Sequence, residues 1–311
     1  MNDFRKPILS GQSPLAMFVF SSMGVLLIGL LFQLTGMLFT VLFFDVSVFD
    51  LLELQGDEEN KVINAIKFLQ IFGALGTFVF SSFLISFFYT GSWFGYFHFG
   101  REINPRAAVL LVLIMVAALP FVNFLTDINQ RFEIPFETAA DYLRQLEDKT
   151  ENMMMTLIRA DNIGALLVNI FMIAIIPAVG EELVFRGLIQ RHLTEMFKNG
   201  HLAVIVASVI FSLVHFQIFS FLPRFFLGLI LGYAFYYGKT IWYPMIAHLV
   251  NNTLGVVFYY YYTKGQGGET LEEIGTSELM PAMALLSLFI VALLMYLWVK
   301  VLATKLPRPG Y

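Results

Sequence analysis

Residues 15–44 read LAMFVFSSMGVLLIGLLFQLTGMLFTVLFF, a run in which no side chain carries a charge. A helix needs about 20 mostly apolar residues to cross the hydrocarbon core of a bilayer, and this run is long enough to do so. It is also longer than the apolar core of a signal peptide, and no obvious small-residue cleavage site follows it. With Arg5 and Lys6 in front of it, the run predicts an uncleaved first transmembrane helix.

The composition of the whole chain points the same way. Of the 311 residues, 58% are hydrophobic and 14% are charged, and the mean hydropathy is +0.74, whereas soluble domains carry roughly a quarter charged residues. We therefore predict an all-α fold, a polytopic transmembrane bundle of about eight helices in contact with membrane lipid. The expected spans are 15–44, 64–90, 106–126, 163–197, 200–221, 223–238, 240–262 and 279–303.

Charge and cysteine content exclude several classes of protein. The net charge of −4 says little by itself, since it bears on solubility and non-specific association and not on fold. Nucleic acid is an unlikely partner. The chain has no cysteine, which excludes disulfides, thiolate metal sites and a cysteine nucleophile. More lysine and arginine residues fall on the N-terminal side of the expected spans than on the other side, so we predict a multi-pass protein with both termini in the cytoplasm.

The spans suggest three parts, and polar residues separate them. The first part, 1–162, holds three helices and a long polar loop, the second, 163–262, holds four helices, and the third, 263–311, holds the last helix. Within the loop 127–162, charged and apolar residues alternate from Thr138 to Ile158 in the manner of an amphipathic helix. That helix is expected to lie at the membrane interface; alternatively, it acts as a lid or recruits substrate. No internal repeat of the kind that marks many transporters is visible.

The middle part concentrates charges where a bilayer makes them costly. Glu181-Glu182-Leu-Val-Phe-Arg186 follows a long apolar run, and an ionisable side chain inside a membrane bundle marks a functional site by default. Glu182 and Arg186 are four residues apart on a helix and can pair, whereas Glu181 points about 100° away. One carboxylate is thus neutralised and the other is left free. Alternatively, both have only a structural role, as an ion pair beside a glutamate at a helix end.

Two neighbouring spans add imidazole and amide groups. Phe211 and His215 lie one turn apart, and His248 and Asn252 share one face of another helix. Counted from the expected turn at Asn199, Glu182 and His215 reach similar depths and can face each other. Each histidine or asparagine could also be a buried hydrogen-bonding residue between helices, and Gly228 with Gly232 forms a small-xxx-small pattern that allows close helix packing.

Together these groups are the ingredients of a hydrolase. A carboxylate in a pocket of low dielectric can act as a general base on water, and a histidine can hold that water or pass a proton to a leaving amine. A second histidine and an amide can donate hydrogen bonds to the oxyanion that forms on a peptide carbonyl. Glu181, His215 and His248 could instead be ligands of a catalytic zinc ion. Composition and spacing leave both mechanisms open.

The three motifs resemble those of a known family. Glu181-Glu182-Leu-Val-Phe-Arg186, Phe211-Ser-Leu-Val-His215 and His248-Leu-Val-Asn-Asn252 resemble the EExxxR, FxxxH and HxxxN motifs of the CPBP (Abi) intramembrane proteases, which include CAAX prenyl endopeptidases and bacteriocin-processing enzymes. The resemblance covers about 164–256. It implies an intramembrane endopeptidase in which Glu181 and His215 activate water, while His248 and Asn252 stabilise the oxyanion. Glu182, Arg186 and Phe211 would support the site, and no metal cofactor is favoured.

The substrate is not readable from the sequence. The family implies a peptide or protein substrate, such as a lipidated protein or a bacteriocin or pheromone precursor. Two other classes stay in view: a non-catalytic immunity or scaffold protein of the membrane, and an ion-coupled transporter. The transporter is disfavoured because the buried ionisable residues are confined to 181–252. Outside the motifs, His192 and His201 flank the expected turn at Asn199 and are predicted to face solvent or lipid headgroups.

Overall fold

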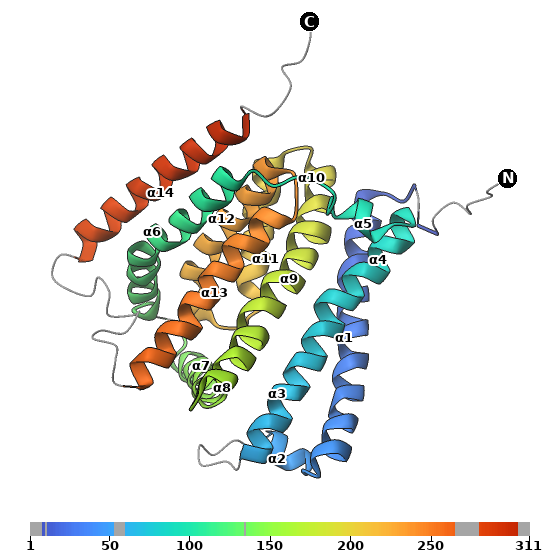
Figure 1. Ribbon diagram of the computed structural model, residues 1–311, viewed down its shortest axis with the longest axis vertical. Helices are drawn as coiled ribbons and strands as arrows, with labels where there is room; N and C mark the ends of the chain where they lie inside the picture. Colours follow the sequence, from blue (N-terminus) through green and yellow to red (C-terminus); the bar gives the residue numbers. More distant parts are fainter. Residues whose placement is uncertain (1–7, 10, 53–59, 134, 265–279, 304–311) are drawn as a thin grey trace, which may run out of the picture.

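The structure, a computed structural model, describes residues 8, 9, 11–52, 60–133, 135–264 and 280–303. Throughout these ranges the chain is all-α and contains no strand, as the sequence predicted. Eight helical rods form the bundle, and three further helices lie between them (Figure 1).

The rods match the predicted spans closely in number and position. They are α1 (Pro14–Phe44); α3, η1 and α4 (Asn60–Ala74, Leu75–Phe80, Ser81–Thr90); α6 (Pro105–Gln130); α8, η2, α9, η3 and α10 (Ile163–Asn169, Ile170–Ile175, Ile176–Glu182, Leu183–Gln190, Arg191–Phe197); α11 (Gly200–Leu213); η4 and α12 (Ile218–Ser220, Phe221–Gly238); α13 (Trp242–Thr263); and α14 (Met280–Ala303). The shorter or amphipathic helices are α2 (Val48–Leu52), α5 (Trp93–Tyr96) and α7 (Glu137–Ile158).

Six of the rods are long and apolar enough to cross a membrane, which makes the chain an integral multi-pass membrane protein. The two others, α11 and α13, fall short for different reasons. With 14 residues, α11 measures only about 21 Å at ~1.5 Å per residue. His248, Asn251 and Asn252 interrupt the apolar sequence of α13.

The predicted span 200–221 was wrong at its C-terminal end. The helix stops at Leu213, and Phe216 takes the left-handed conformation with φ of 54°. The chain then turns through η4 into α12, where Pro223 lies in the first helical turn and its missing N–H breaks no hydrogen bond. The helix is therefore too short to cross a bilayer, and His215, just beyond its end, lies inside the bundle.

The rods are arranged in three groups (Figure 1). At one edge α1 packs antiparallel to the α3–α4 rod, at the opposite edge α14 packs on α6, and the rods from α8 to α13 lie between them. The start of α1 and the end of α14 lie on the same side of the bundle (Figure 1). The terminal residues 1–7 and 304–311, which carry much of the charge behind the predicted cytoplasmic termini, lie outside the described ranges, and the membrane orientation stays a prediction.

The central rod, from α8 to α10, contains two π-helical segments, η2 and η3. Such segments are rare and occur often at functional sites, and here they flank α9, which carries Glu181 and Glu182. Every residue of η3 is buried. Its two polar side chains donate to α12: Arg186 to the Gly228 carbonyl and Gln190 to the Gly232 carbonyl, at 3.1 and 3.0 Å. The predicted close packing at these glycines is confirmed.

One flanking histidine is not where the sequence suggested. His192 in α10 is fully buried, and its Nε2 lies 3.1 Å from the Ser21 hydroxyl of α1. The prediction that it faces solvent was wrong because α10 packs against α1, a contact that local sequence does not reveal. His201 is exposed, as expected.

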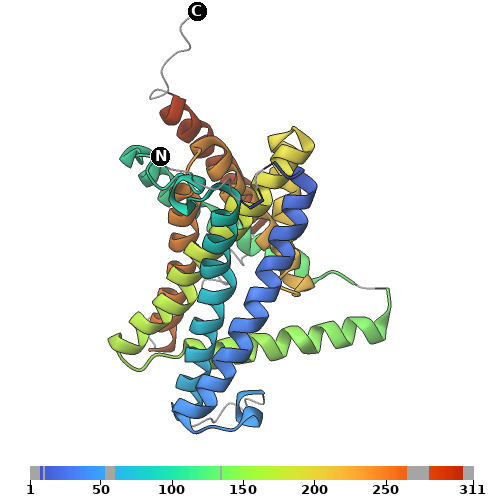
Figure 2. The same ribbon diagram turned by 90° about the vertical axis from the view of Figure 1, so that its right-hand side faces the viewer.

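The amphipathic helix predicted at 138–158 is confirmed as α7, which lies across the bundle rather than along it (Figure 2). The Glu147 carboxylate accepts a hydrogen bond of 2.9 Å from the Phe219 N–H in η4, and the Arg144 guanidinium stacks over the Phe219 ring. Tyr142 on the same helix is exposed. The helix is thus tied to the turn between α11 and α12.

Candidate active site

The adjacent glutamates of α9 have different environments, as their helical positions suggested. Glu182 is completely buried, and its Oε1 lies 3.1 Å from Arg186 Nη1. Arg186 is itself 1% exposed and stacks its guanidinium 4.8 Å above the Phe211 ring. The predicted ion pair is therefore present and shielded from solvent.

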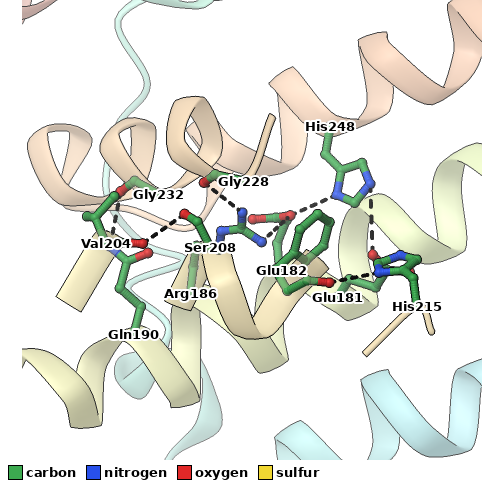
Figure 3. Close-up of polar contacts among 11 residues, drawn as sticks. Glu181, Glu182, Arg186, Gln190, Val204, Ser208, His215, Gly228, Gly232 and His248 are labelled. Atoms are coloured by element: carbon green, nitrogen blue, oxygen red, sulfur yellow. Dashed lines mark hydrogen bonds and ion pairs between the residues drawn. The ribbon is translucent and has the colours of Figure 1, made fainter. Parts of the chain in front are cut away.

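His248 of α13 connects the two carboxylates (Figure 3). Its Nδ1 lies 2.7 Å from Glu182 Oε1, and its Nε2 lies 4.0 Å from Glu181 Oε2. Because a carboxylate only accepts hydrogen bonds, the contact with Glu182 places a proton on Nδ1. The opposite nitrogen of His248 is then directed to the side of the site where Glu181 lies.

Glu181 is the freer of the two carboxylates. Its side chain is 15% exposed, and in the described part of the chain its closest charged contact is the distant one with His248. It lines a cavity of about 1090 Å³ that His215, His248 and Asn252 also line. An acid with little direct neutralisation beside a cavity is a candidate base.

His215 lies just beyond the end of α11, and this location fixes its ring. The last carbonyls of a helix have no partner within the helix, and the carbonyl of Phe211 is one of them. The His215 Nδ1 donates to that carbonyl across 2.7 Å, so the neutral ring leaves Nε2 as an acceptor. The phenyl ring of Phe211 packs at 5.2 Å from the His215 ring and 6.1 Å from the His248 ring. Phe211 thus supports both histidines.

Asn252 has a structural partner that the sequence did not suggest. Its amide nitrogen donates to the Ile173 carbonyl at 3.1 Å, and four residues beyond Ile173 stands Pro177, which has no N–H to offer. The side chain of Asn252 therefore donates to a carbonyl whose α-helical partner position is occupied by a proline. It also lines the cavity, and its second amide hydrogen, which has no acceptor in the described part of the chain, is available to a ligand.

The sequence reasoning missed Arg224, which lines the same cavity from the first turn of α12. It donates to the Gln217 side chain, and its charge interacts with those of Glu181 and Glu147. Its Nη1 is buried and has no hydrogen-bond partner among the residues that the structure describes. The signal that could have revealed it is an arginine directly after Pro223 at the start of an apolar helix. Arg224 places a positive charge beside the candidate base.

The fit of the alternative metal site can be judged from the donor set. Within the described ranges, no group of three or more His, Cys, Asp or Glu side chains is arranged to hold a metal ion. The Nδ1 of His248 is occupied by Glu182. The predicted zinc set of Glu181, His215 and His248 therefore does not form a three-ligand arrangement here.

The ion pair yields a stability prediction. We expect Glu182→Gln to lower stability by about 1.5–3 kcal/mol, the typical worth of a hydrogen bond to a charged group, because the buried Arg186 loses its anionic partner. The midpoint of thermal unfolding in detergent, followed by size-exclusion chromatography, would fall by several degrees. The matched control is Glu151→Gln on the exposed face of α7, which should leave the midpoint unchanged. Equal midpoints for both variants would contradict the assignment.

Comparisons with known proteins match the segment that carries this site to a family model. Residues 163–254, which contain all three motifs, match the family described as type II CAAX prenyl endopeptidase Rce1-like. The predicted resemblance is confirmed for this segment. The boundaries of the Rce1-like segment agree closely with those expected from the motifs.

A curated relative supports the same assignment. The chain is 35% identical over 95 residues to the membrane-embedded CAAX protease MroQ of Staphylococcus aureus (strain USA300). The aligned region covers 29% of this chain and 38% of that relative, so well under half of either protein is compared. No solved structure gave a significant match.

Proposed function

We propose that the protein is an intramembrane endopeptidase that hydrolyses a peptide bond with water activated by Glu181. The observation that carries this proposal is that the two adjacent carboxylates have different partners. Glu182 is held by Arg186 and His248, whereas Glu181 lines the cavity and has no close ionic partner among the described residues. The Rce1-like segment supports it, since both matches bear the names of CAAX peptidases.

In the proposed reaction, Glu181 removes a proton from a water molecule while the Nε2 of His215 accepts a hydrogen bond from it. The resulting hydroxide attacks the carbonyl carbon of the scissile bond, and the negative charge moves to the carbonyl oxygen. The proton held by Glu181 then passes to the leaving amine as the C–N bond breaks. One water is consumed, and one carboxylic acid and one amine are released.

His248 and Asn252 are the proposed donors to the oxyanion. When protonated, the His248 ring can donate from Nδ1 to Glu182 and from Nε2 to the substrate, and the buried Glu182 carboxylate stabilises that charged ring much as the aspartate of a catalytic triad does. Asn252 would contribute the amide hydrogen that Ile173 does not use. Two preorganised donors are a common means of stabilising a tetrahedral intermediate.

We propose a peptide or protein substrate with an apolar segment near the scissile bond. The wall of the cavity is largely apolar and includes Met172, Leu227, Val256 and Phe258. Lipidated proteins and bacteriocin or pheromone precursors share this chemistry. The relatives' names supply the CAAX class, which for this chain is part of the proposal.

The proposal is tested with purified protein in liposomes and a library of fluorescence-quenched apolar decapeptides. Cleavage in ¹⁸O-labelled water should place one labelled oxygen in each new carboxyl terminus, as detected by mass spectrometry. Products without the label, or no products while the folded protein binds library peptides, would favour the non-catalytic binding protein. The control is the same preparation after heat denaturation.

A further inference from the structure

Two glutamine side chains outside the Rce1-like segment face the proposed active-site cavity. Gln33 comes from α1 and Gln70 from α3, and both line the cavity that Glu181 lines. Neither makes a hydrogen bond with another side chain or backbone group in the described ranges. A side-chain amide carries two donors and an acceptor oxygen, and leaving such groups without partners in a bilayer is costly.

The position of Gln33 is set by a glycine on the neighbouring helix. A Cβ atom on Gly73 would collide with Gln33 Oε1, so the amide lies across α3 in the space that this glycine leaves. Gly73 lines the cavity too, one turn beyond Gln70 on the same helix. The two amides therefore occupy one region of the cavity wall.

The height of this region relative to Glu181 follows from helix geometry. Gly180 of α9 packs directly on Phe78 of η1, which places Phe78 level with the start of the glutamate pair. Gln70 precedes Phe78 by eight residues, or about 12 Å at ~1.5 Å per residue. An extended peptide covers that distance in roughly three to four residues at ~3.3 Å each.

An extended substrate needs such partners. A peptide bond must leave a helix to be attacked by water, and each backbone N–H and C=O released in this way lacks a partner inside a membrane unless the protein supplies one. We infer that Gln33 and Gln70 bind the backbone of the peptide substrate roughly three to four residues from the scissile bond. This inference rests on the proposed peptidase function, and it assigns a substrate-binding role to the otherwise unassigned first two rods.

The test uses binding, so that it does not depend on cleavage. The probe is a fluorescein-labelled apolar decapeptide, chosen from the library by its binding to Glu181→Gln in liposomes. In that background we expect Gln33→Leu and Gln70→Leu each to raise the Kd about three- to tenfold, the effect of one hydrogen bond. The matched control Gln130→Leu removes an exposed glutamine that does not line the cavity, and it should not change the Kd.

A second measurement identifies the backbone as the bound group. Replacing one peptide N–H of the probe with an ester oxygen, at each position in turn, should weaken binding most at the third or fourth residue from the scissile bond. The loss should disappear in the glutamine variant that has already lost that contact, because the two changes remove one interaction. Additive losses, unchanged Kd values in the leucine variants, or failure of every library peptide to bind would overturn the inference.

Failure of the proposed function gives a different result. If the wild-type chain does not cleave but the leucine variants still weaken binding, the two glutamines bind peptide and the proposed peptidase function is wrong. If the wild-type chain cleaves and the leucine variants have the same KM as the wild type, the peptidase function is supported and the binding role of the two glutamines is wrong. In an active enzyme the variants should raise KM with little change in kcat, as expected for binding shared by ground and transition states.

Discussion

Glu181→Gln should lower the rate of peptide cleavage by ~10²-fold or more, which is the usual contribution of a general base. The substitution keeps the length and hydrogen-bonding capacity of the side chain but removes its ability to take a proton from water. Because Glu181 has no close ion pair in the described part of the chain, its loss should leave the fold intact. The measurement is the single-turnover rate on the best-cleaved library peptide in liposomes.

The control for this prediction is Glu195→Gln, which neutralises an exposed glutamate further along the same rod. Both variants should elute and unfold as the wild type does. Near-wild-type turnover by Glu181→Gln would remove Glu181 from the mechanism. Equal losses of cleavage rate in both variants would show that removing a negative charge anywhere on this rod lowers the rate.

Most of the fold was predictable because lipid contact imposes a simple pattern. An apolar run such as 15–44 has few alternatives to a spanning helix, and the amphipathic pattern of 138–158 was sufficient to place α7. The end of α11 was not predictable from hydropathy. Residues 214–221 remain largely apolar, but the chain turns where Phe216 adopts a left-handed conformation, and Ser212 donates across the turn to the Phe221 carbonyl.

The candidate site, too, was predictable from the sequence only in part. Spacing along one helix predicted the Glu182–Arg186 pair, since residues four apart meet on one face. Contacts between helices were less accessible: the sequence indicated neither that His248 would bond Glu182 nor that Asn252 would satisfy the carbonyl of Ile173. Arg224 and the two glutamines were missed because each is a single polar residue outside any motif. The cavity brings these residues into one site with Glu181.

His248→Ala should lower the cleavage rate by about 10²–10³, the usual cost of losing one donor to an oxyanion. The structure adds a second effect, because the ring also donates to the buried Glu182 carboxylate, and the thermal midpoint should therefore fall slightly. His248→Asn separates the two effects. Its shorter amide retains a donor for Glu182 but does not reach the substrate, so we expect a rate close to that of His248→Ala with a smaller loss of stability.

The same variant decides between the two mechanisms that the sequence left open. If zinc were required, Glu181, His215 and His248 would bind it at about 2.0–2.2 Å with one position left for water, and His248→Ala would lose metal and activity together. In the mechanism proposed above, His248 donates hydrogen bonds to Glu182 and to the oxyanion and binds no metal. Purified active protein should then contain no stoichiometric metal, and a strong chelator should not change its rate. Elemental analysis showing about one zinc per active chain, lost in His248→Ala, with chelated wild-type protein recovering activity when zinc is added back, would establish the metallopeptidase instead.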